Sequence, residues 1–335
     1  MLQITRVGAI CLCIAAAGAA LAVAAGPERR IPPRSSPPLP TLVGVGRPDA
    51  PDALSWTPDG RSLFAVAAAR KGGAGLFRIR AGRRPRRVGG LGRFATAAVS
   101  PDASRIAAYE EGEFGARIEF RALDGRLVSR SASFASNPYE YPRLIWAPDS
   151  RRLVVPTQAR RRGLRVLDAA TGRLVGAFGG PSTYLDRQLW SPDGRRLALP
   201  TRDGARLVDV ATRAVRVVRG ALDDASYAWS PDGSLLATSG SGGAVVVVDL
   251  ATSRRCRVTR HAASGTSWSP DGRLAFMLAQ AEDAKSIVVG VARPCSGSDR
   301  ARVALVKVAD DDGRGDILTW SPDGRRLALS LDGKV

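Results

Sequence analysis

Short apolar runs recur along the chain, and each follows a polar turn sequence. They carry no helical period, and their length suits β-strands that are buried on both faces. The runs are Leu63–Val66, Leu153–Val155, Leu197–Leu199, Leu235–Ala237 and Leu327–Leu329. Because a second strand is expected to end just before each turn, the pattern predicts a series of β-hairpins.

The turn itself is a repeated Trp-Ser-Pro-Asp-Gly sequence. Pro presets φ for a type I turn, Ser can cap it, and Gly accepts the positive φ that closes a three-residue hairpin loop. All six tryptophans open a copy. The residues assigned to this structural repeat are Trp56, Pro58, Asp59, Gly60, Trp146, Trp190, Pro192, Asp193, Gly194, Trp229, Asp232, Gly233, Trp268, Asp271, Gly272, Trp320, Asp323 and Gly324.

Two copies depart from the pattern. Ala103 and Ser150 stand where the others have Gly, and Val99 replaces the Trp of the second copy. A residue other than Gly at positive φ costs about 1 kcal/mol, so these two turns could adopt another geometry. The second unit is also expected to pack less aromatic area than its neighbours.

The copies begin at positions 56, 99, 146, 190, 229, 268 and 320. A period near forty residues with several strands per unit is typical of a β-propeller. In the fourth unit the strands are expected at about 186–191, 195–200, 205–210 and 214–219. The third strand often ends in an Asp-x-Ala-Thr turn, whose side chains can bond turn backbone. Copies of that turn begin at Asp168, Asp209 and Asp249.

The sequence therefore predicts an all-β, seven-bladed propeller over residues 41–335. A strand at Thr41–Gly46 is placed to close the ring with the last blade. The chain stops at Val335, where the third strand of that blade is due. We therefore expect the last blade to be incomplete; the alternative is that the sequence is truncated.

Residues 1–26 combine Arg6 with an apolar stretch that ends in small residues, which predicts a secretory signal peptide and export. The alternative is a retained N-terminal membrane anchor. Residues 27–40 are rich in Pro and Arg and are interpreted as a linker.

The formal net charge is +19, which favours attraction to anionic surfaces. The Arg83–Arg87 and Arg160–Arg162 clusters are expected in solvated loops. No motif indicates specific nucleic-acid binding. Cys256 and Cys295 are the cysteines that follow the linker, so an exported chain could join them in a disulfide.

Residues suited to catalysis are sparse. His261 is the single histidine and is expected at a strand end, and no Gly-x-Ser-x-Gly elbow is present. The acids of Asp310–Asp316 are interpreted as a solvated turn. We predict no catalytic, cofactor-binding or metal-binding residue.

Trp-Ser-Pro-Asp-Gly followed by Arg-x-Leu-Ala resembles the WD-like propeller repeat of the TolB type, and is similar to the propellers of prolyl-oligopeptidase-like proteins. The TolB resemblance implies an exported, non-catalytic scaffold that binds a protein or an envelope surface. The chain departs from TolB, because the α/β domain that precedes that propeller is missing and seven blades are expected instead of six. The alternatives are a hydrolase or lyase with its site in the channel, a subunit without its catalytic domain, and a polyanion-binding envelope protein.

Overall fold

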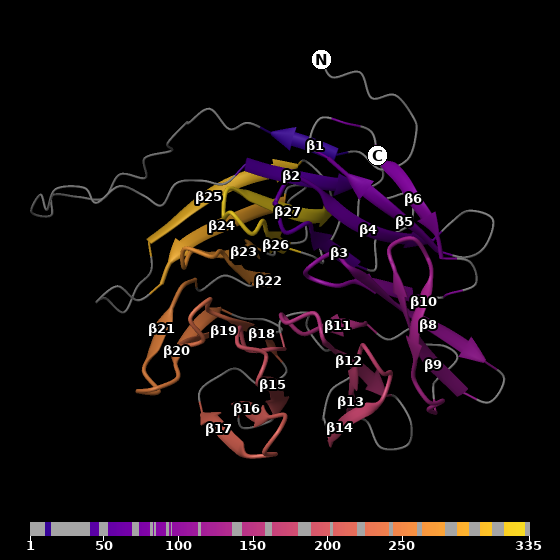
Figure 1. Cartoon of the computed structure of the whole chain (residues 1–335). Helices are drawn as coiled ribbons and strands as arrows, with labels where there is room; N and C mark the ends of the chain where they lie inside the picture. Colours follow the sequence, from indigo (N-terminus) through magenta and orange to yellow (C-terminus); the bar gives the residue numbers. More distant parts are fainter. Residues whose placement is uncertain are drawn as a thin grey trace, which may run out of the picture.

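The computed structural model (Figure 1) describes residues 11–14, 41–46 and most of 53–331. Within that last range it leaves out 69–73, 81–82, 84, 92–93, 95, 113–114, 136–142, 158–162, 180–188, 202–203, 220–224, 241–243, 260–262, 279–286, 295–301 and 310–317. The fold is all β and forms a β-propeller.

Hydrogen bonds join the described strands into seven sheets, which we name in chain order. The first sheet holds β3 (Ala53–Trp56), β4 (Leu63–Ala68), β5 (Ala74–Ile79) and β6 (Arg86–Gly90). The second holds β7 (Thr96–Val99), β8 (Arg105–Gly112), β9 (Gly115–Ala122) and β10 (Leu127–Arg130). The third holds β11 (Ile145–Trp146), β12 (Arg152–Thr157), β13 (Gly163–Asp168) and β14 (Leu174–Gly179).

The fourth sheet holds β15 (Arg196–Thr201), β16 (Gly204–Asp209) and β17 (Val215–Arg219). The fifth holds β18 (Ala225–Trp229), β19 (Leu235–Gly240), β20 (Val245–Asp249) and β21 (Arg255–Arg257), and the sixth β22 (Ala263–Trp268), β23 (Leu274–Leu278), β24 (Ile287–Arg293) and β25 (Arg302–Ala309). The closing sheet holds β26 (Leu318–Trp320), β27 (Arg326–Leu331), β2 (Thr41–Gly46) and β1 (Cys11–Ile14). Figure 1 shows the sheets arranged around a common centre.

The propeller has six complete blades, whereas the sequence predicts seven blades. Six sheets have four paired strands, the number of a full propeller blade, and the fourth sheet has three. Its expected first strand is reduced to one bridge between Trp190 and Leu197, and residues 186–188 of that strand lie outside the described part of the chain. The other three strands fall within one residue of the predicted positions.

The prediction of an incomplete last blade is wrong. The closing sheet has four strands, because the N-terminal segment supplies two of them and not one. β2 pairs with β27 in parallel, as the ring-closing role of residues 41–46 requires, and β1 pairs with β2 in antiparallel register. β1 falls inside the predicted signal segment; the rest of residues 1–26 and the linker 27–40 lie outside the described residues.

The core lies between consecutive sheets. The apolar runs are buried, except that Leu235 is partly exposed, as the lack of alternation predicts; β15, for example, is buried over Leu197–Pro200. One cluster joins the ends of the ring, where Leu54, Trp56 and Ile79 of the first sheet pack with Ala328 of the closing sheet. The strands are thus buried on both faces because each sheet packs on two neighbours.

The second sheet buries aromatic side chains although its copy of the repeat lacks the tryptophan, and the expectation that it packs less aromatic area than its neighbours stays a prediction. Tyr109 and Phe120 are almost fully buried there, with Phe134 beside them. Phe120 meets Trp146 of the third sheet edge to face, with ring centroids 5.7 Å apart. These rings pack between the second and third sheets, whereas Val99, which stands in place of the tryptophan, packs with side chains of the first sheet.

The two turns without glycine keep the geometry of the others. Ala103 has φ 56° and Ser150 has φ 57°, close to the 63° of Gly60. The Ala103 N–H donates to the Ser100 carbonyl at 2.8 Å, the bond that Gly60 makes to Thr57. The neighbouring structure therefore imposes the left-handed conformation, and no alternative turn forms.

The Asp-x-Ala-Thr turns form as predicted. Asp168 Oδ1 accepts from the backbone N–H groups of Ala170 and Thr171 at 3.1 and 2.8 Å. Asp209 and Asp249 accept the equivalent bonds. The position that closes this turn has positive φ in Gly172, Arg213 and Ser253.

Gly172 lies where the second and third sheets approach closely, and this contact leaves no room for a larger residue. A Cβ on Gly172 would lie 2.2 Å from the carbonyl oxygen of Arg130 in the second sheet, at φ 70°. Gly125 has φ 92° and nothing within 4 Å of such a Cβ. Since left-handed strain alone costs about 1 kcal/mol, Gly125→Ala should lower the free energy of unfolding by about that amount, and Gly172→Ala by clearly more. Urea unfolding of both variants checks this; equal losses would contradict it.

Several predicted features can be placed only in part. Cys256 lies buried on β21 and is disulfide-bonded, whereas Cys295 lies outside the described residues, so their pairing stays a prediction. Arg86 and Arg87 are exposed, but on strand β6 and not in a loop. His261, the Arg160–Arg162 cluster and residues 310–316 are also outside the described part. No helix of the described structure is long and apolar enough to cross a membrane.

Candidate functional site

The repeated turn is a closed hydrogen-bond unit that uses its own carboxylate. In the fifth sheet the Ser230 hydroxyl donates to Asp232 Oδ1 at 2.6 Å and accepts from the Leu235 N–H at 2.8 Å. Asp232 Oδ1 also accepts from the Ser234 N–H at 3.0 Å. The same pattern recurs at Asp193 and Asp323. The Ser and Asp of the repeat therefore hold the turn.

These bonds set the protonation of the turn carboxylates. The hydrogen bond from Ser230 lowers the pKa of Asp232, with help from the Ser234 N–H. Burial alone would raise the pKa of Asp193, but the Ser191 hydroxyl and the Arg195 N–H outweigh it and the pKa is lowered. A group ionised well below neutral pH is a poor proton donor or acceptor at neutral pH. The ring of acids is therefore accounted for by turn structure.

Each tryptophan bonds the sheet before its own. The indole N–H donates to the carbonyl of the residue just before the anchor position of that sheet, which is the first position of the repeat and holds Trp or, in the second copy, Val99. These bonds run from Trp56 to Thr319 (3.1 Å), Trp146 to Ala98 (3.0 Å), Trp190 to Ile145 (3.4 Å), Trp229 to Leu189 (3.2 Å), Trp268 to Ala228 (3.0 Å) and Trp320 to Ser267 (3.0 Å). We call this set the indole ring. It is interrupted between the first and second sheets, because Val99 has no side-chain donor.

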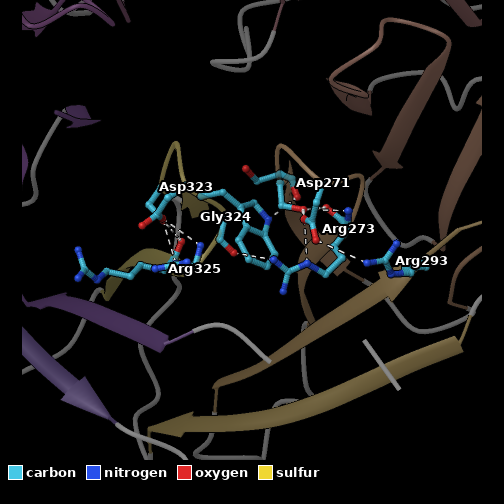
Figure 2. Close-up of polar contacts among 11 residues, drawn as sticks. Asp271, Arg273, Arg293, Asp323, Gly324 and Arg325 are labelled. Atoms are coloured by element: carbon cyan, nitrogen blue, oxygen red, sulfur yellow. Dashed lines mark hydrogen bonds and ion pairs between the residues drawn. The ribbon is translucent and has the colours of Figure 1, made fainter. Parts of the chain in front are cut away.

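Arginines that follow the turns add further contacts between consecutive sheets. The Arg273 guanidinium lies 4.7 Å from the centre of the Trp320 ring and donates to the Gly324 carbonyl at 2.6 Å. Figure 2 shows Arg273 in contact with Asp271 on one side and Gly324 on the other. Arg326 reaches Gly60 in the same way at 2.6 Å, which ties the closing sheet to the first. These arginines are thus structural.

A second set of arginines is exposed at the end of the ring where the turns of the repeat lie, which we call the turn face. Each directly follows the turn position that closes with positive φ, and each is exposed. We call them the turn-face arginines: Arg61, Arg151, Arg195 and Arg325, from the first, third, fourth and closing sheets. Because the repeat places them at one position of the unit, they gather at the same end of the ring.

A cavity of about 380 Å³ is lined by the inner strands of the first, second, third, sixth and closing sheets. The turn residues Pro101 and Pro322 line it too, so it reaches the turn face. Of the described residues that line it, Arg143 is the one with a charge, and it is exposed. The described side chains contain no cluster of three or more His, Cys, Asp or Glu that could hold a metal ion.

Five consecutive sheets each contribute one polar residue to the lining of this cavity. The sixth, closing and first sheets contribute the residue just before their tryptophan, which is Ser267, Thr319 and Ser55 respectively. The second and third sheets contribute the residue three positions before the anchor, which is Thr96 and Arg143 respectively. We call these five residues the polar arc. Because these residues occupy two different positions of the repeat, its register alone does not single them out. Of the structural repeat residues, four tryptophans also line the cavity, and their indole N–H groups bond the preceding sheets: Trp56, Trp146, Trp268 and Trp320.

The comparisons with known proteins add no family. No protein-family model matches the chain, and no curated protein matches it either. The molecule is therefore placed by its architecture, as a β-propeller whose sheets are joined by the indole ring.

Proposed function

We propose that this protein is an exported, non-catalytic β-propeller that binds an anionic partner, an acidic protein or an envelope polymer, through the turn face. In this proposal the fourth sheet and Trp190 count as a seventh blade, and the repeat belongs to the TolB-like type. The disulfide at Cys256 supports export, because disulfides persist mainly outside the cytoplasm.

The observation that carries the proposal is the placement of the turn-face arginines. Arg61, Arg151, Arg195 and Arg325 are exposed at equivalent positions of four sheets. The neighbouring turn carboxylates Asp59, Asp193 and Asp323 accept hydrogen bonds within their own turns. Exposed positive charges at one end of the ring favour association with an acidic surface and raise its rate.

The test is binding of purified protein to the envelope fraction and to anionic vesicles over a range of salt. Replacing the four turn-face arginines with Gln should abolish most binding at low salt, and wild-type binding should fall steeply as salt rises. The matched control replaces four exposed arginines on outer strands, Arg87, Arg219, Arg255 and Arg257. Equal loss in both variants would show that only net charge matters, and binding that is insensitive to salt would contradict the proposal.

A further inference from the structure

The central cavity has the composition of a small-molecule site. Such sites are mostly apolar, with a few polar groups that converge on the ligand and set its orientation. Here Leu54, Ala97, Leu144, Ile145 and Leu318 supply the apolar lining, and the polar arc supplies four hydroxyls and one guanidinium. The volume of about 380 Å³ falls in the range of sites for small organic ligands.

The side-chain polar groups of the arc have no partner among the described residues, although the backbone carbonyls of Thr319 and Ser267 accept indole bonds. The hydroxyls of Ser55, Thr96, Ser267 and Thr319 make no hydrogen bond to another described residue, unlike the turn serines. The guanidinium of Arg143 likewise has no ion pair or hydrogen bond within the described part of the chain. Arg273 and Arg326, in contrast, are bonded to neighbouring turns.

Charge decides the class of ligand. The lining holds one cation and no carboxylate among its described residues, so an anion is favoured over a cation. A guanidinium binds a carboxylate through two parallel N–H···O bonds, and hydroxyl groups can donate to the same oxygens. The apolar lining favours a ligand with an apolar body beside its charged group.

We propose that the central cavity binds a small organic carboxylate, whose charged group meets Arg143 and the hydroxyls of the polar arc and whose apolar body lies against the neighbouring aliphatic side chains. This site lies inside the ring and needs neither the turn-face arginines nor a macromolecular partner. It is therefore independent of the function proposed above.

The experiment uses the full purified chain with sodium benzoate as the probe, its neutral isostere benzamide, and inorganic phosphate, all at constant ionic strength. Trp56, Trp146, Trp268 and Trp320 line the cavity, so tryptophan emission reports occupancy, and calorimetry gives the affinity. Benzoate should bind saturably and about tenfold or more tightly than benzamide, since a charge-assisted pair is lost in the neutral probe.

Variants locate the site. Arg143→Gln should weaken benzoate about tenfold and leave benzamide unchanged, and a Ser267→Ala, Thr319→Val double variant should weaken benzoate several-fold. Arg219→Gln, an equally exposed arginine on β17, is the matched control and should change nothing. Thermal melting of each variant verifies the fold.

Any of three results with benzoate would overturn the inference. Benzoate could fail to saturate, it could bind no better than benzamide, or it could bind equally well to Arg143→Gln. Phosphate binding in the absence of benzoate binding would point to an inorganic anion and also contradict it. The variant without turn-face arginines should bind benzoate as tightly as wild type does, so each of the two proposals can be refuted without the other.

Discussion

Trp229→Ala is expected to lower the free energy of unfolding by about 4 kcal/mol, the range found when a large buried aromatic is truncated. The Trp229 side chain is 4% exposed and packs between the fourth and fifth sheets. Its indole N–H donates to the Leu189 carbonyl, and Arg196 lies 5.1 Å from the ring centre. The truncation therefore removes packing, a buried hydrogen bond and a cation–π contact together.

Trp229→Phe separates these contributions. Phenylalanine keeps most of the apolar contact but has no N–H, so the Leu189 carbonyl loses its indole donor, and a loss of about 1–2 kcal/mol is expected beyond the small change in area. Guanidinium unfolding followed by circular dichroism measures both variants. A loss below about 1 kcal/mol for the alanine variant would show that the indole does not join the sheets.

Glu119→Gln is expected to cost about 3 kcal/mol at neutral pH, because it removes one side of a buried ionic cluster. The Glu119 side chain is fully buried on β9 and accepts hydrogen bonds from Arg121 at 2.6 Å and from Arg130. The amide can accept only through its one oxygen, so the two arginines lose their charged partner. Glu111→Gln, at a partly exposed position of β8, is the matched control and should stay within about 0.5 kcal/mol of wild type.

The same carboxylate gives a pH dependence of known sign. Burial raises the pKa of Glu119, but the hydrogen bonds and charges of Arg121 and Arg130 outweigh it, so the folded pKa lies below the ordinary 4.5. Stability contributed by a lowered carboxyl pKa is present above the unfolded value and is lost as pH falls through the folded one. The difference between wild type and Glu119→Gln should therefore be constant near neutral pH and shrink below about pH 4. A difference independent of pH would contradict the ionic cluster.

The repeat sequence predicted most of the fold because its residues act locally. Ser, Pro, Asp and Gly set one turn from within it, and the apolar runs on either side have no alternation, so strand type and burial follow. The regular period then predicted the propeller and the role of residues 41–46 in closing it. Ala103 and Ser150 have the same positive φ as the glycines at this position in the other copies, because the strands that they join impose it.

The errors came from contacts between segments far apart in the chain. Pairing of β1 with β2 completes the closing sheet, and no local pattern at Cys11–Ile14 indicates such a partner. The buried Tyr109 and Phe120 of the second sheet lie on β8 and β9, away from the first strand on which the repeat places its tryptophan, so the repeat sequence does not indicate them. The polar arc also becomes visible only when five strands are placed around one cavity.

The central claim is that six indoles join consecutive sheets of one ring. The most direct test labels the tryptophans with ¹⁵N and follows hydrogen exchange of the indole N–H groups by nuclear magnetic resonance. All six signals should be protected and should exchange only with opening of the sheets they join. Exchange of most indoles at the rate of a free tryptophan side chain would contradict the claim.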